Sequence, residues 1–204
     1  MEPAIKKARF SVLKNDAARD VLGIVGFVLA IIAGIFLLNS FVFQTYSVEG
    51  GSMEATLHSG DRVWVNKVPV TVAGIQGKKY MPERGTIIVF QNPLVRAQST
   101  EQHVVKRVIG LPGERITVKD GVLKVYTAQA PNGFEPDKSI AGPQSPSSGD
   151  INITVPDNEL FVAGDNRIGQ HSLDSRNGLS TISLDLIEGP VSARIWPLQN
   201  WRWF

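Results

Sequence analysis

The chain has 204 residues, with 21 Lys and Arg against 19 Asp and Glu, and it contains no cysteine. A net charge of +2 lacks the excess of basic residues that nucleic-acid binding requires, so no nucleic-acid partner is expected. The absence of Cys excludes disulfides, thiolate catalysis and cysteine-ligated metal centres. A hydrophobic content of 43% excludes disorder as the overall state.

The N-terminal region predicts a membrane anchor. Residues 21–38 contain no charged, amide or hydroxyl side chain, and the apolar character continues to Phe43. As a helix, residues 21–43 would span roughly 34 Å, which is enough to cross the hydrocarbon core of a bilayer. A buried core helix would have a polar face, and a cleaved signal peptide would be shorter and end in small residues. Neither alternative fits this segment.

The charges on either side of the segment predict its orientation. The first basic residue after the span is Arg62, whereas five basic residues precede it: Lys6, Lys7, Arg9, Lys14 and Arg19. By the positive-inside rule, residues 1–20 form a cytoplasmic tail and residues 44–204 lie on the outer side of a cell membrane that the chain crosses once.

The pattern of residues 44–204 is typical of a mostly β domain. Short β-branched runs bounded by turn residues predict strands, and no amphipathic helix of useful length is expected between residues 61 and 126. The predicted strands cover residues 61–67, 85–90, 103–109, 115–119, 121–126, 151–155, 160–163 and 191–196. Pro, Gly and Ser dominate residues 131–149, so residues 127–150 are expected to be a loop-like insertion and not a second domain.

Histidine and metal chemistry are not favoured. His58, His103 and His171 are far apart in the sequence, and none lies in a metal-binding motif, so neither a metal nor a cofactor is expected. The most suggestive hydroxyl is Ser52, because Gly50 and Gly51 before it allow a substrate main chain to approach closely. The same glycines would equally suit a flexible exit from the membrane.

Lys106 and Arg107 lie inside an apolar predicted strand, where alternation makes them face opposite ways. Burial of a lysine disfavours its charged form, and a neutral amine can act as general base toward a serine hydroxyl. An arginine cannot, because it does not deprotonate in proteins. The alternative is that Lys106 reaches solvent along a sheet edge.

A third polar cluster comprises residues 164–167 and 172–176, and it suits either a structured turn that braces an active site or a solvated loop. Together, the three clusters resemble the ordered motifs of bacterial type I signal peptidases. Residues 52–57 resemble the nucleophile motif, residues 85–90 the following strand, residues 106–114 the lysine motif, and residues 164–167 with 172–176 the last motif.

The resemblance implies a β-rich signal-peptidase-like catalytic domain behind a transmembrane helix, without cofactor. It implies a Ser–Lys endopeptidase that removes signal peptides from exported preproteins after small residues, in an Ala-x-Ala pattern. Ser52 would be the nucleophile, its N–H an oxyanion donor, and Lys106 the general base. Ser172 would orient the lysine, and three residues would support the site: Asp165, Asp174 and Arg176.

The chain departs from the family pattern at three places. Gly50 lacks the hydroxyl that some members carry two residues before the nucleophile, and Ala55 replaces a usual proline, at a cost of about 0.5–1 kcal/mol in stability. Four residues separate Arg167 from Ser172 where the family usually has two, so Ser172 could be displaced from Lys106.

Two other functions remain open from the sequence. One is a Ser–Lys peptidase that cleaves itself, and the other is a tethered, non-catalytic domain that binds preproteins. The C-terminal segment holds three of the four tryptophans. Trp196 is expected to pack into the core, whereas Trp201 and Trp203 are expected to anchor at the bilayer interface.

Overall fold

The computed structural model describes residues 3–95, 102–140, 142–143, 146–168 and 172–204, with side chains from residue 18 onward. The chain divides into two compact units, Met1–Phe41 and Val42–Phe204, and each is described by itself. The second is called the β unit below.

The first unit is one long helix, α1 (Pro3–Phe41). Its segment Ala18–Phe41 is 24 residues long with a mean hydropathy of 3.0, and none of its most apolar stretch is buried in protein. A helix that is apolar on every face and uncovered by protein is suited to a lipid environment. The helix ends at Phe41, and Phe43 already belongs to the first strand of the β unit.

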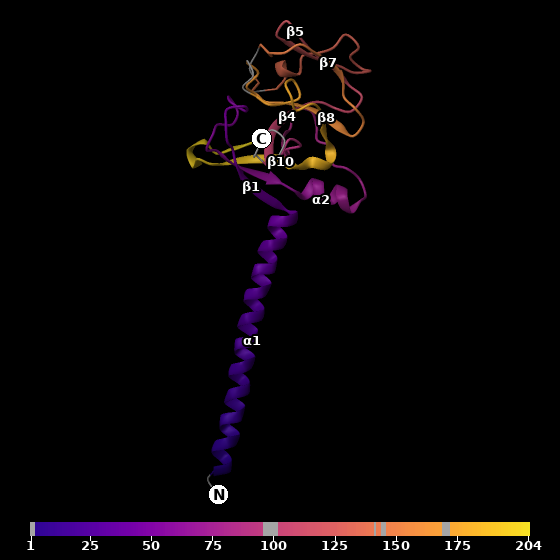
Figure 1. Ribbon diagram of the computed structural model, residues 1–204. Helices are drawn as coiled ribbons and strands as arrows, with labels where there is room; N and C mark the ends of the chain where they lie inside the picture. Colours follow the sequence, from indigo (N-terminus) through magenta and orange to yellow (C-terminus); the bar gives the residue numbers. More distant parts are fainter. Residues whose placement is uncertain (1–2, 96–101, 141, 144–145, 169–171) are drawn as a thin grey trace. The chain divides into compact units, whose positions relative to one another are not determined.

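The β unit consists of two antiparallel sheets (Figure 1). The large sheet has the order β1-β2-β10-β3-β4-β8-β9, with β11 paired to β10, and the small sheet has the order β6-β5-β7. The strands of the large sheet are β1 (Phe43–Ser47), β2 (Arg62–Asn66), β3 (Ile87–Gln91), β4 (His103–Gly110), β8 (Glu159–Ala163), β9 (Ile182–Ser183), β10 (Ile187–Trp196) and β11 (Arg202–Trp203). Those of the small sheet are β5 (Arg115–Lys119), β6 (Val122–Tyr126) and β7 (Ile151–Thr154). The mostly β fold class is confirmed.

Helical elements of the β unit are short. They are α2 (Val68–Ile75) and the 3₁₀ turns η1 (Pro136–Lys138), η2 (Leu184–Leu186) and η3 (Leu198–Asn200). The sequence predicted no amphipathic helix of useful length between residues 61 and 126, and α2, which lies in this range, has only eight residues. Its valine-rich sequence has the composition of a strand, so the pattern gave no indication of this short helix.

The two sheets share a hydrophobic core at the place where β4 passes into β5. Ile109 from β4, Ile116 from β5 and Phe161 from β8 are fully buried and belong to one cluster. A Cβ atom at Gly110 would lie 2.7 Å from Ile116 Cδ1, so a larger residue there would force the Ile116 side chain to move. The core therefore holds the end of β4 firmly in place.

Trp196 does not pack into the core, which corrects the expectation from the sequence. The odd-numbered residues of β10 from Ile187 to Ala193 are buried, and Trp196 lies beyond them with 53% of its surface exposed. A register shift between Arg194 and Trp196 interrupts the pairing of β10 with β2 at this point. Side-chain alternation and the local irregularity therefore leave the ring outside.

The described part of the insertion packs against the β unit. Phe134 pairs with Val125 in an isolated bridge, and Pro136 is buried in η1. Ser147 is 3% exposed, and the Ile140 side chain approaches Gly85. The insertion thus contributes buried side chains to the β unit. Its Pro/Gly/Ser-rich composition had predicted a loop and did not indicate these contacts.

Candidate active site

Ser52 lies in a tight turn between β1 and β2. Gly50 begins the turn at φ +77°, a left-handed conformation that favours glycine. The turn is anchored by Met53 and Leu57, which are 1% and 0% exposed. Backbone bonds from Thr56 N and Leu57 N to Met53 O, both 2.8 Å, complete it. A buried anchor on the C-terminal side thus fixes a serine that remains accessible.

Lys106 comes from the middle of β4, where it pairs with Ile88 of β3. Its Nζ lies 2.7 Å from Ser52 Oγ and 3.0 Å from Val105 O. The residue is only 4% exposed, so its side chain does not reach solvent along a sheet edge. The fold thus brings together the two residues that the sequence singled out, although 54 positions separate them.

Arg107 is buried as well and makes a second polar cluster. Its Nε and Nη2 donate to the two carboxylate oxygens of Asp165, at 2.8 and 2.6 Å, and Nη1 donates to Gly85 O at 2.7 Å. Thr56 Oγ1 donates to the same carboxylate. A two-pronged arginine–carboxylate pair is geometrically specific. It therefore ties β4 both to the nucleophile turn and to the segment after β8.

Asp174 is the centre of a third buried cluster. Arg176 donates to both of its carboxylate oxygens, at 3.0 and 2.7 Å, while Ser172 Oγ donates at 2.6 Å and Gly164 N at 2.9 Å. Burial raises the pKa of Asp174, but the hydrogen bonds and charge of Arg176, with those from Ser172 and Gly164, hold it below its ordinary value overall.

Gly164 allows the last motif to approach the nucleophile. A Cβ atom there would lie 2.3 Å from Ser172 Oγ and 2.3 Å from Ser52 O, which is too close for any side chain. Asn166 N donates to Ser52 O at 3.0 Å, and Asn166 Nδ2 donates to Gly51 O at 3.1 Å. Two carbonyls of the nucleophile turn are thus held by the segment that follows β8.

Ser172 is 1% exposed and lies beside Gly164 and the Ser52 carbonyl. Three of the four residues that separate Arg167 from Ser172, 169–171, lie outside the described residues. The role of Ser172 in orienting Lys106 stays a prediction. Its observed hydrogen bond is to Asp174.

Arg167 brings the insertion into the same region. Its side chain is fully buried, and Nη2 donates to Asp137 Oδ1 at 2.8 Å. Burial lowers the pKa of Arg167, and burial also raises the pKa of Asp137 in spite of the opposing charge. Gly142 lies against Thr56 Oγ1 and Arg107 Nη2. Sequence reasoning missed these contacts, because no local pattern links the insertion to the site.

Ser52 and Lys106 line two neighbouring clefts. The larger, of about 250 Å³, is otherwise lined mainly by β1 and β4, with Tyr46 and His103 among its residues. The smaller, of about 180 Å³, is bordered by Gly50, Leu173 and Leu179. An extended chain could therefore occupy both sides of Ser52 Oγ. Within the part of the chain that the structure describes, no group of three or more His, Asp or Glu residues could hold a metal ion.

The pKa of Asp174 predicts an acid-sensitive contribution to stability. A carboxyl whose pKa is lowered in the folded state stabilises it above the unfolded pKa, and this contribution is lost as the pH falls through the folded pKa. The free energy of unfolding of Asp174→Asn should therefore lie below that of the wild type at neutral pH. The difference should shrink on acidification to about pH 3.

Urea unfolding followed by tryptophan fluorescence measures this difference. Asp157→Asn is the matched control, because Asp157 is exposed between β7 and β8 and should leave the free energy of unfolding nearly unchanged. A difference for Asp174→Asn that stays constant from neutral to acid pH would contradict the prediction.

Comparisons with known proteins identify the family to which this chain is similar. The model of the family "Signal peptidase, peptidase S26" matches residues 21–196. Signal peptidase I T of Bacillus subtilis (strain 168) is 34% identical over 184 residues, covering 86% of this chain and 84% of that protein. Signal peptidase I P of Bacillus subtilis subsp. natto is 35% identical over 182 residues, covering 86% and 88%.

A crystal structure of a signal peptidase I from Enterococcus faecalis V583 is similar at 29% identity with a TM-score of 0.41, covering 54% of this chain and 97% of that one. The N-terminal apolar helix fits a single-pass membrane protein. The family match over most of the chain and the relatives above 30% identity establish that this chain belongs to the signal peptidase family, peptidase S26, whose serine peptidases remove signal peptides.

Proposed function

We propose that this chain is a membrane-bound endopeptidase that cleaves signal peptides from exported preproteins by a Ser–Lys dyad. The observation that carries the proposal is the 2.7 Å separation of Lys106 Nζ and Ser52 Oγ at the wall of a cleft. This distance is within the reach required of a nucleophile and its general base.

In the proposed reaction, neutral Lys106 accepts the proton of the Ser52 hydroxyl as Oγ attacks the scissile carbonyl. The resulting tetrahedral intermediate expels the amine, which takes a proton from the Lys106 ammonium, and an acyl-enzyme ester remains on Ser52. Lys106 then accepts a proton from water as that water attacks the ester, and it returns the proton to Ser52 when the new N-terminal fragment leaves as a carboxylic acid.

The buried clusters around the dyad support its geometry. Asp165 holds Arg107, the residue directly after Lys106, while Asp174 and Arg176 hold the segment that packs on the Ser52 carbonyl. We propose Ser172 as a positioning residue for Lys106. The Ser52 N–H is the proposed oxyanion donor, and Gly50 offers no side-chain donor beside it.

The substrate class follows from the cleft and the anchor. A cleft of about 250 Å³ beside Ser52 has room for a short segment of a substrate chain, and the family resemblance is the ground for proposing small residues in an Ala-x-Ala sequence. The nucleophile follows the end of the membrane helix after a single short strand and its turn. A preprotein is also cut just beyond its own membrane-embedded segment, so the proposed topology, with the β unit outside, brings both to the same membrane face.

The first prediction of this proposal concerns the dyad. Ser52→Ala and Lys106→Met should each lower kcat for an Ala-x-Ala preprotein in detergent by at least about a thousandfold, because each removes a reacting group. Ser183→Ala and Lys119→Met are the matched controls in other parts of the β unit and should retain activity. N-terminal sequencing of the product measures the cleavage position.

Two outcomes would favour the rival functions. Self-cleavage at a defined position without cleavage of an added preprotein would favour a self-processing peptidase. Preprotein binding that Ser52→Ala leaves intact, with no turnover by the wild type, would favour a binding domain.

The second prediction concerns the pH dependence of cleavage. Lys106 is nearly fully buried beside Ser52, and only a neutral amine can accept the serine proton. Catalytic efficiency should therefore rise with pH as the neutral fraction of the amine increases. His103 also lines the cleft. An optimum near pH 6.5 that His103→Gln abolishes would assign the base to His103 instead.

The third prediction concerns Gly164. Gly164→Ala should lower kcat on the order of a hundredfold, because the added Cβ would push Ser172 and the Ser52 carbonyl apart. Gly74→Ala is the control, since a Cβ there meets nothing within 4 Å. Full activity of a folded Gly164→Ala protein, judged by circular dichroism, would count against this role.

The fourth prediction concerns the exposed C-terminal rings. Aromatic contacts run from Phe43 at the start of β1 through Trp64 and Trp203 to Trp201, with ring centroids 5.8, 5.9 and 5.1 Å apart. Trp201 and Trp203 are 49% and 55% exposed, and tryptophan favours the headgroup region of a bilayer.

Replacing both Trp201 and Trp203 by Ser should weaken vesicle binding of a soluble fragment comprising residues 42–204, as measured by vesicle sedimentation. Val122→Ser removes an exposed apolar side chain from the small sheet and should not weaken it. Equal sedimentation of all three fragments would exclude interfacial anchoring by these rings.

A further inference from the structure

The short helix α2 exposes an unusual number of apolar side chains. Val68, Val72 and Ile75 are 40%, 43% and 82% exposed, and their spacing of four and three residues places them on one face of the helix. No residue of α2 is buried. An exposed apolar stripe on a soluble domain commonly marks a contact surface.

The opposite side of α2 is held by the β unit. Val70 packs against the hydrophobic cluster that contains Ile88 and Phe90, and Tyr80, shortly after the helix, packs against the same cluster. Val70 anchors the helix from within, so the stripe of Val68, Val72 and Ile75 is presented by a fixed helix.

The start of α2 is bonded to the residue that follows the membrane helix. Lys67, the N-cap residue of α2, donates its backbone N–H to Val42 O at 2.9 Å, and Val42 directly follows Phe41, the last residue of α1. The register agrees, because Phe43 of β1 pairs with Asn66 of β2. Paired strands lie about 4.8 Å apart, so α2 begins at the depth where the chain leaves the membrane segment.

We propose that α2 lies in the boundary between headgroups and acyl chains of the bilayer, with Val68, Val72 and Ile75 directed into the lipid. The proposal deepens the proposed function, because it rests on the membrane anchoring of the chain. It commits to a lipid surface, since the first residue of the stripe comes directly after the N-cap residue that is bonded at the membrane exit.

The flanks of α2 suit this position. Lys67 precedes the stripe and pairs through Nζ with Glu188 at 3.2 Å, and Lys78 and Lys79 follow the stripe. The Lys79 Nζ already pairs with Asp185 at 2.6 Å on the protein surface. Lysine stems lie along apolar surface while their ammonium groups stay among the headgroups, so cations at both ends of an apolar stripe fit an interfacial helix.

This contact would fix the β unit in its rotation about the membrane exit. A single covalent connection at Val42 leaves a tethered domain free to turn, whereas a second, apolar contact opposes turning. The cleft beside Ser52, whose wall includes β1, would then be held at a set height above the bilayer. The β unit would then not have to rotate before a preprotein segment that emerges from the membrane could reach Ser52.

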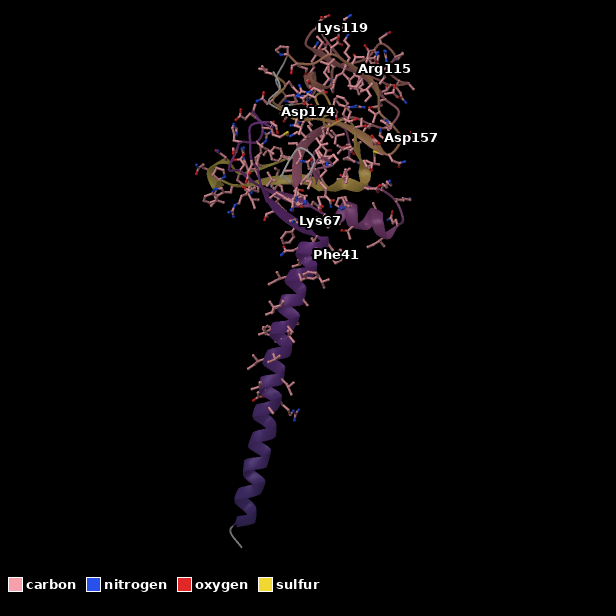
Figure 2. All side chains as sticks on the ribbon, viewed as in Figure 1. Phe41, Lys67, Arg115, Lys119, Asp157 and Asp174 are labelled. Carbon is pink, nitrogen blue, oxygen red and sulfur yellow. The ribbon has the colours of Figure 1, made fainter. Side chains whose placement is uncertain are left out.

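The chain has no native cysteine, so single-cysteine variants test this directly. Full-length Ile75→Cys and Val72→Cys, labelled with the environment-sensitive fluorophore NBD, are reconstituted in phosphatidylcholine–phosphatidylglycerol vesicles with or without lipid spin-labelled near the headgroup. The control is Lys119→Cys, because Lys67 and Lys119 lie at opposite ends of the β unit in Figure 2. We expect quenching at positions 72 and 75 to exceed that at position 119 by at least about twofold.

The alternative outcomes are distinguishable. Water-like emission at positions 72 and 75, with the protein still resistant to alkaline extraction from the vesicles, would overturn the proposal and leave the anchoring intact. Loss of the protein on extraction would instead show that the anchoring itself fails, and the proposal with it. NBD emission could instead change with the number of protein molecules per vesicle and not with spin-labelled lipid. That result would assign the stripe to contact with a second copy of the chain and would also overturn the proposal.

Discussion

Two consecutive cations of β4 are buried, and each must be paired or neutral in the folded protein. Arg107 cannot lose its proton, so it needs a buried carboxylate, which Asp165 supplies with two hydrogen bonds. Lys106 differs in its chemistry, because an amine, unlike a guanidinium, can lose its proton, and its Nζ lies 2.7 Å from Ser52 Oγ. Alternation along one strand thus separates a structural cation from the proposed general base, and the polar clusters of the site follow from this need.

The segment after β8 supplies most of the partners. Asp165 holds Arg107, Asn166 holds two carbonyls of the nucleophile turn, and Asp174 collects donors from Gly164, Ser172 and Arg176. Buried polar networks are favourable when their members are hydrogen-bonded, so these bonds restrain the described residues of this segment, 164–167 and 172–176. Steric contact restrains this segment as well, because a side chain at Gly164 would collide with Ser172 Oγ and the Ser52 carbonyl oxygen. The nucleophile turn, β4 and this segment are consequently held against one another.

The β unit also exposes apolar side chains near its first residues. Phe43 begins the aromatic contacts that run to Trp201, and α2 starts beside Val42 with its stripe of Val68, Val72 and Ile75 exposed. Strand pairing accounts for both, because β2 returns along β1 to the point where the chain enters the unit. Under the proposed topology, the cost of exposing these side chains to water would be removed by lipid.

The long apolar helix and the mostly β class followed from the sequence, since hydropathy and strand alternation are local signals. The pairing of Ser52 with Lys106 was implied by the ordered motifs that resemble the signal peptidase family. The sequence by itself also separated the roles of lysine and arginine, because their proton chemistry does not depend on the fold. Only the tertiary structure decided that Trp196 is exposed, that residues 68–75 form a helix and that Asp137 of the insertion reaches Arg167. Those outcomes depend on which surfaces meet, and contacts between distant segments leave no periodic trace in either segment.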